Sequence, residues 1–122
     1  MISITPLKDP SDPETANDPD VLSYIEFMKK YLPEENPLNA AAVNGYVTAS
    51  LASYILEKCG DDLTRDNVLK QAITLNAPPI GMLRQGVSIR TSPDNYLPYS
   101  AAALIRFDGA KWVAIGAPIS LK

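Results

Sequence analysis

The stretch Asn39–Gly60, NAAAVNGYVTASLASYILEKCG, predicts one long helix around which the rest of the chain can be placed. Its apolar side chains recur every three to four residues from Val43 onwards, as in a helix with one buried face. A second row at the same spacing consists of small residues: Ala41, Gly45, Ala49 and Ala52. Gly45 costs about 1 kcal/mol of helix propensity relative to alanine, and close packing is the usual compensation. We therefore expect this helix to be buried on two sides and to end at Gly60.

A shorter amphipathic helix is predicted upstream, starting at Asp18-Pro19. Asp18 can cap the free amides, and Pro19 suits the first helical position because its missing N–H would have had no partner. The apolar stripe then follows at spacings of four, three and four: Val21, Ile25, Met28 and Leu32. Pro33 ends this helix.

A third helix is expected downstream of the long one. Thr64 is its predicted N-cap, and the helix should end near Leu75, before Pro78-Pro79. At the other end of the chain, Ile2–Thr5 alternates apolar and polar residues and predicts a short strand, followed by a turn-rich connector up to Pro13.

The last third of the chain predicts strands. Gly86–Arg90, Ala101–Phe107 and Lys111–Gly116 have the composition or alternation of strands, and Asp108–Ala110 predicts a hairpin loop between the last two. The expected fold class is therefore α/β: one domain with a strand and connector (1–13), helices (14–76) and strands (86–118).

Composition excludes several classes of function. The 122 residues carry 11 basic and 14 acidic side chains, a net charge of −3, so no basic surface for nucleic acid is expected. No apolar run is long enough to cross a bilayer. Pro6, Asp9 and Pro10 lie where the apolar part of a signal peptide would be, so none is predicted at Met1.

The sequence also argues against an enzyme. It has no histidine, the commonest general base and zinc ligand. The single cysteine, Cys59, is interpreted as a small apolar residue, and Asp61-Asp62 as solvated or capping carboxylates rather than a metal site. No catalytic residue, metal or cofactor is predicted.

Six segments carry a resemblance to a known family. In chain order they are Leu7–Pro13, Gly45-Tyr46, Lys58–Val68, Thr91–Tyr96, Arg106–Gly109 and Lys111-Trp112. Together they resemble the closing portion of the type I periplasmic solute-binding proteins of branched-chain amino acid ABC transporters, the Leu/Ile/Val-binding-protein-like family. The similarity runs nearly end to end, although each motif alone is weak.

The resemblance implies a partial fold and a function in transport. Family members have two α/β lobes joined by a hinge, and the lobes close on a small solute. This chain resembles the last hinge crossing and the C-terminal part of the first lobe. It implies a periplasmic component that binds an amino acid or related organic acid and meets ABC permease subunits. Two alternatives stay open: a sensory receptor domain of the same fold, and a self-associating fragment without a solute.

Two positions match the cleft-lining start of the family's corresponding helix, and they are the expected ligand contacts. Asn44 stands where many relatives have an aromatic residue, which favours a more polar ligand. Tyr46 offers a ring and a hydroxyl to a small-molecule pocket. The structural alternatives are a helix-start hydrogen bond for Asn44 and a core or hinge role for Tyr46.

A shortened chain should expose apolar surface that the missing parts of the fold would cover. Surface of this kind commonly drives self-association. We therefore expect a homodimer or higher assembly.

Overall fold

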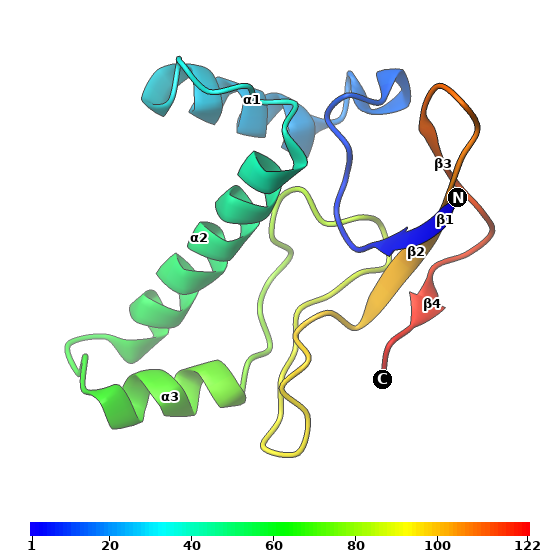
Figure 1. Ribbon diagram of the computed structural model, residues 1–122. Coiled ribbons are helices and arrows are strands. Elements are labelled where there is room, and N and C mark those ends of the chain that lie inside the picture. Colours follow the sequence, from blue (N-terminus) through cyan, green and yellow to red (C-terminus); the bar gives the residue numbers. More distant parts are fainter.

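The three helices lie on one side of the molecule and a small antiparallel sheet on the other (Figure 1). The computed structural model describes residues 1–122. Its elements are β1 (Ile2–Thr5), the 3-10 helix η1 (Pro13–Thr15), α1 (Pro19–Tyr31), α2 (Ala40–Cys59), α3 (Arg65–Ile73), β2 (Ala101–Phe107), β3 (Trp112–Ala114) and β4 (Ile119–Ser120). Residues 74–100 run between the helices and the sheet with little regular structure. The predicted order of one strand, three helices and a hairpin region is confirmed.

Local side-chain hydrogen bonds fix the ends of α1 and α2. The Asp18 carboxylate accepts a bond of 2.9 Å from the Asp20 N–H, with Pro19 in the first turn. The Asn39 side chain accepts one of 2.9 Å from the Ala41 N–H. Gly60 ends α2 with a φ of 59°, a conformation that residues with a Cβ rarely adopt. These ends confirm the sequence prediction.

The third helix begins as predicted and ends slightly earlier. The Thr64 hydroxyl accepts a bond of 3.4 Å from the Asn67 N–H. The helix stops at Ile73 rather than near Leu75, because residues 75–77 bond to residues 89–91 instead.

The sheet is built around β2. Ile2 lies opposite Arg106 where β1 pairs with β2, and Phe107 lies opposite Trp112 where β2 pairs with β3. The two-residue strand β4 pairs with the first residues of β2. All pairings are antiparallel.

The predicted hairpin loop between β2 and β3 is confirmed. The Asp108 carboxylate accepts hydrogen bonds of 2.9 Å from the N–H groups of Ala110 and Lys111. Gly109 has a φ of 110°, which favours glycine at this turn position. These backbone hydrogen bonds hold the pKa of the Asp108 carboxyl below its usual range.

The main core lies where α1, α2 and residues 75–89 meet. Its buried members are Val21, Tyr24, Met28, Val43, Val47, Leu75, Ile80, Met82, Leu83 and Ile89. Tyr24 is fully buried, and its hydroxyl donates a 2.8 Å hydrogen bond to the Pro37 carbonyl at the turn before α2. The core therefore uses the predicted apolar stripe of α1 and the Val43 row of α2.

The prediction that α2 is buried on two sides is wrong. Ala41, Gly45, Ala49 and Ala52 are all exposed. A Cβ built on Gly45 would meet no atom within 4 Å. The row of small residues therefore has no partner within this chain, and the helix packs through its Val43 face alone.

The strand predicted at Gly86–Arg90 does not form. Ile89 pairs with Tyr99, and Arg90 with Asn76, only as isolated bridges. The neighbouring segments contain Pro78 and Pro98, which have no N–H to donate, so neither ladder extends beyond a single pair. The strand region instead includes β4, which is too short for the sequence pattern to indicate.

Candidate functional site

The two predicted ligand contacts lie on opposite sides of α2. Consecutive helix residues differ by about 100°, so Asn44 and Tyr46 project about 200° apart. Asn44 is exposed on the outward face. Tyr46 is half-buried and packs edge-on against Tyr24 and Phe27, with ring centroids 5.2 Å apart in both pairs. The structure therefore does not bring Asn44 and Tyr46 together at one place.

The contacts of Asn44 and Tyr46 also bear on their structural alternatives, a helix-start hydrogen bond and a core or hinge role. Asn39 is the N-cap of α2, and Asn44 lies five residues later, so Asn44 is not the helix-start capping residue. Tyr46 does pack against the core, as its structural alternative expects. A role in ligand contact stays a prediction for both.

Tyr46 lines a groove of about 640 Å³ between α1 and α2. Phe27 and Leu32 form one side of this groove, and Gly45 and Ala49 belong to the other. Glu35 is the single charged residue in its lining. The groove is lined mainly by apolar side chains, together with polar groups such as those of Asn39 and Ser53.

A second hollow, of about 300 Å³, lies between the connector after β1, the start of α2 and Trp112. Three charged residues take part in its lining: Lys8, Asp9 and Arg84. Lys8 and Asp9 are neighbours in the connector, and Arg84 comes from a segment far away in the sequence. A mixed lining of charged and apolar side chains is the usual composition of a small-molecule site.

Arg84 is held in place by the connector. Its backbone N–H donates to the Pro6 carbonyl at 2.9 Å, and its Nε–H donates to the Leu7 carbonyl, also at 2.9 Å. It takes part in none of the chain's four ion pairs. Because an arginine side chain stays charged and presents five N–H groups, Arg84 offers a positioned cation to a carboxylate.

The positive charge of Lys8, by contrast, is already balanced by two carboxylates. Its ammonium group lies 2.9 Å from a carboxylate oxygen of Asp18 and 2.6 Å from one of Asp20. Burial opposes the charge of Lys8, but the hydrogen bonds that its ammonium group donates to Asp20 and Asp18 outweigh this effect and raise the pKa of Lys8 above 10.5. The hydrogen bond from Lys8 in turn lowers the pKa of Asp18 below 3.8.

This ion-pair cluster predicts a pH dependence of stability. The contribution of Asp18 is present above pH 3.8 and is lost as the pH falls through its lower folded-state pKa. The contribution of Lys8 is present below pH 10.5 and is lost as the pH rises through its higher folded-state pKa. We expect Lys8→Met to cost about 0.5–1 kcal/mol near neutral pH. The loss should become small once the pH falls below the lowered folded-state pKa of Asp18.

Urea unfolding at a series of pH values measures this effect. Lys70→Met, an exposed lysine of α3 outside any ion pair, is the matched control. An equal loss for Lys8→Met at acid and neutral pH would contradict the assigned pairing.

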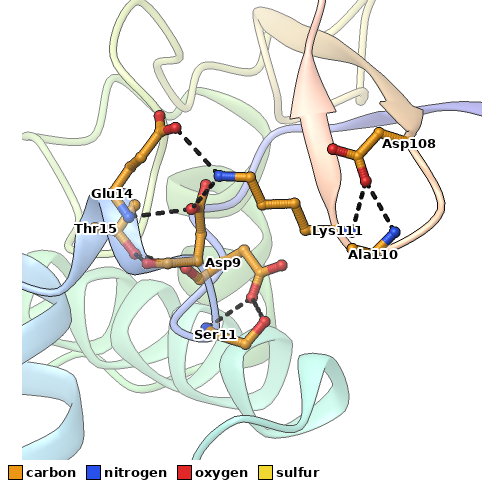
Figure 2. A network of polar contacts seen from close by, with 8 residues as sticks. Asp9, Ser11, Glu14, Thr15, Asp108, Ala110 and Lys111 are labelled. Atoms are coloured by element: carbon orange, nitrogen blue, oxygen red, sulfur yellow. Dashed lines mark hydrogen bonds and ion pairs between the residues drawn. The ribbon is translucent and has the colours of Figure 1, made fainter.

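Polar contacts hold the connector that forms one rim of this hollow (Figure 2). The Asp9 carboxylate accepts hydrogen bonds from the Ser11 N–H and hydroxyl, and the Thr15 hydroxyl donates to the Asp9 carbonyl at 2.7 Å. Lys111, in the hairpin loop, reaches across to Glu14 at 3.1 Å. Its hydrogen bonds to Glu14 and to Asp12 raise the pKa of Lys111. Hydrogen bonds within the connector, and the ion pair with Lys111 next to the sheet, thus hold this rim in place.

Comparisons with known proteins show which solved structure has a similar fold. No family profile and no curated protein matches the chain. A solved structure does: that of a branched chain amino acid ABC transporter from Thermus thermophilus with bound valine, at a TM-score of 0.73 and 18% sequence identity. The match covers 98% of this chain and 33% of that one. The chain has the fold of one part of this transporter protein.

The predicted resemblance is thereby confirmed for the fold. The similar protein is a branched chain amino acid ABC transporter. This chain spans about a third of its length, so two thirds of that protein have no counterpart here. None of the helices in this chain combines the length and apolar character needed to cross a membrane.

Proposed function

We propose that this chain supplies one part of a solute-binding protein of an ABC import system, and that the solute is an amino acid or a related small organic acid. One observation carries this proposal: nearly the whole chain superimposes on part of a transporter structure that holds valine. Binding would be non-covalent, without a metal or cofactor. The two hollows described above are both open to solvent, which fits a single wall of a site that other parts of the fold complete.

The proposed solute contacts are Asn44 and Tyr46. Because they project from opposite sides of α2, a solute as small as an amino acid cannot reach both at one spot. Each is therefore tested by its own substitution. We also propose, from the family resemblance, a periplasmic location, docking on permease subunits and self-association of this chain.

A hybrid protein tests the proposal. This chain replaces the corresponding third of the Thermus thermophilus protein, and valine and other amino acids are titrated calorimetrically. We expect the hybrid to bind one of them. Asn44→Ala or Tyr46→Phe should weaken that binding by about fivefold to tenfold, the effect of one lost hydrogen bond.

Thr48→Ala is the matched control, because Thr48 lies one turn after Asn44 on the same exposed face of α2. It should leave the affinity unchanged. A hybrid that unfolds cooperatively, and is therefore folded, but binds no amino acid would refute the proposed function.

A further inference from the structure

Arg84 is the one half-buried cation of this chain that has no carboxylate within ion-pair distance. The other half-buried basic side chains are Lys8 and Lys111, and each of them forms ion pairs with two carboxylates. A charge that is partly removed from water without a partner is unfavourable. The surroundings of Arg84 therefore favour an anion that comes from outside the chain.

The end of the Arg84 side chain is open to such an anion. Its Nε–H donates to the Leu7 carbonyl at 2.9 Å, which fixes the plane of the guanidinium group. Its Nη groups form no hydrogen bond within the chain. No buried polar side-chain atom lacks a partner, so the Nη groups are in contact with solvent. Because a guanidinium group binds both oxygens of a carboxylate through parallel N–H bonds, Arg84 fits a carboxylate best.

Asp9 lines the same hollow as Arg84 and is a half-buried carboxylate without a cation. It takes part in no ion pair, so it does not neutralise Arg84. Its Oδ1 atom accepts hydrogen bonds from the N–H and the hydroxyl of Ser11, which are both neutral donors (Figure 2). Its Oδ2 atom accepts none within the chain. The hollow thus contains one unpaired positive group and one unpaired negative group.

The rest of this hollow suits a small apolar group. Val43, Ile105 and Trp112 belong to its lining, and its volume is about 300 Å³. This volume is at the lower end of the range of about 300–1,000 Å³ for small-molecule sites. A ligand that matches all these features has a carboxylate, an ammonium group and a small apolar body.

Charge decides between an amino acid and a simple organic acid. A monocarboxylate satisfies Arg84 but brings a second negative charge towards Asp9, whereas a zwitterion offers an opposite charge to each residue. We propose that Arg84 binds the carboxylate and Asp9 the ammonium group of an α-amino acid with an apolar side chain. This inference rests on the proposed function, and it selects the amino acid from the two classes of solute given there.

The hollow is next to one of the two proposed solute contacts. Ala40, in the first turn of α2, belongs to its lining. Asn44 comes four residues later and therefore lies one turn along the same side of the helix. Tyr46 lines the α1–α2 groove instead. An amino acid held by Arg84 and Asp9 is thus on the Asn44 side of α2.

The hybrid protein described above tests this assignment by calorimetric titration with three ligands. Valine has both charges, isovalerate lacks the ammonium group, and valinamide lacks the carboxylate. Arg84→Gln should weaken the binding of valine by about tenfold to a hundredfold, the effect of a lost charged hydrogen bond, and should leave that of valinamide unchanged. Asp9→Asn should weaken valine to a similar extent without weakening isovalerate. A merely structural role of either residue would weaken all three ligands alike.

Matched controls remove the same charges elsewhere. Arg106→Gln and Asp94→Asn lie at exposed positions outside the hollow and outside every ion pair, and they should leave the binding of valine unchanged. Asp9→Asn keeps an oxygen that can accept the hydrogen bonds from Ser11, so it changes the charge and preserves the turn. Cooperative urea unfolding shows that each variant is folded.

Two results would overturn the inference while the proposed function stands. In the first, the hybrid binds valine, and Arg84→Gln and Asp9→Asn weaken this binding no more than the controls do. In the second, Arg84→Gln lowers the free energy of unfolding of the hybrid but not its affinity, because Arg84 pairs with a carboxylate of the Thermus thermophilus part. A folded hybrid that binds no amino acid refutes the proposed function itself.

Discussion

Tyr24→Ala should lower the free energy of unfolding by about 3–5 kcal/mol, the cost of removing a buried aromatic ring. Tyr24 is fully buried at the meeting point of α1 and α2, and its ring packs edge-on against Tyr46. Burial also raises the pKa of its phenol. Because domains of this size are stable by only about 5–15 kcal/mol, this single change removes a large part of the total.

Urea unfolding with two control variants separates the contribution of the Tyr24 ring from that of its hydrogen bond. Tyr24→Phe keeps the ring but removes the hydrogen bond to the Pro37 carbonyl, and should cost about 1 kcal/mol. Tyr96→Ala removes a mostly exposed ring and should change stability by less than about 0.5 kcal/mol. If Tyr24→Ala costs no more than Tyr96→Ala, the core is not where the structure places it.

Substitution of Met82 should also have a large effect on the free energy of unfolding. The backbone conformation of Met82 decides whether alanine or glycine is the more stable replacement. Its side chain is fully buried, so Met82→Ala should cost about 2–5 kcal/mol. Its φ of 72° lies in the left-handed region, where a residue with a Cβ pays about 1–2 kcal/mol. Glycine removes that strain. Met82→Gly should therefore be at least as stable as Met82→Ala, although glycine elsewhere is usually the less stable of the two.

The comparison of the two variants is made by urea unfolding with a shared baseline. Ala77→Gly, in the same segment and without a positive φ, is the control and should show the ordinary loss on changing alanine to glycine. A Met82→Gly protein that is about 1 kcal/mol less stable than Met82→Ala would show that residue 82 is not in the left-handed region.

The helix boundaries could be predicted from the sequence because local side chains decide them. Asp18, Asn39 and Thr64 each accept a hydrogen bond from an N–H two or three residues later. Gly60 adopts the positive φ that ends α2. Each of these contacts lies within a few residues, so a sequence pattern contains all the necessary information.

Residues 74–100 could not be predicted in the same way, because their contacts are distant in sequence. Leu83 pairs with Leu7, and Arg84 donates to the carbonyls of Pro6 and Leu7. No local pattern reports that Arg84 and Trp112 line one hollow with Lys8. The alternation at Gly86–Arg90 predicts a strand that does not form. Alternation describes the side chains of a segment, and it does not show whether the neighbouring segments have N–H groups to donate.

Helical geometry could have shown from the sequence that the two predicted ligand contacts do not lie at one place. Asn44 and Tyr46 are two residues apart, so any helix through them sends the side chains to opposite sides. The row of small residues is visible in the sequence, but the sequence does not show whether other residues of this chain cover it. In the structure that face is open.

Calorimetric titration of the isolated chain with valine and the other amino acids tests the central claim most directly. If the chain forms only one wall of a solute site, no amino acid should bind more tightly than about 1 mM, an affinity of about 4 kcal/mol. A dissociation constant in the micromolar range would show that these 122 residues hold a complete site, and would contradict this account.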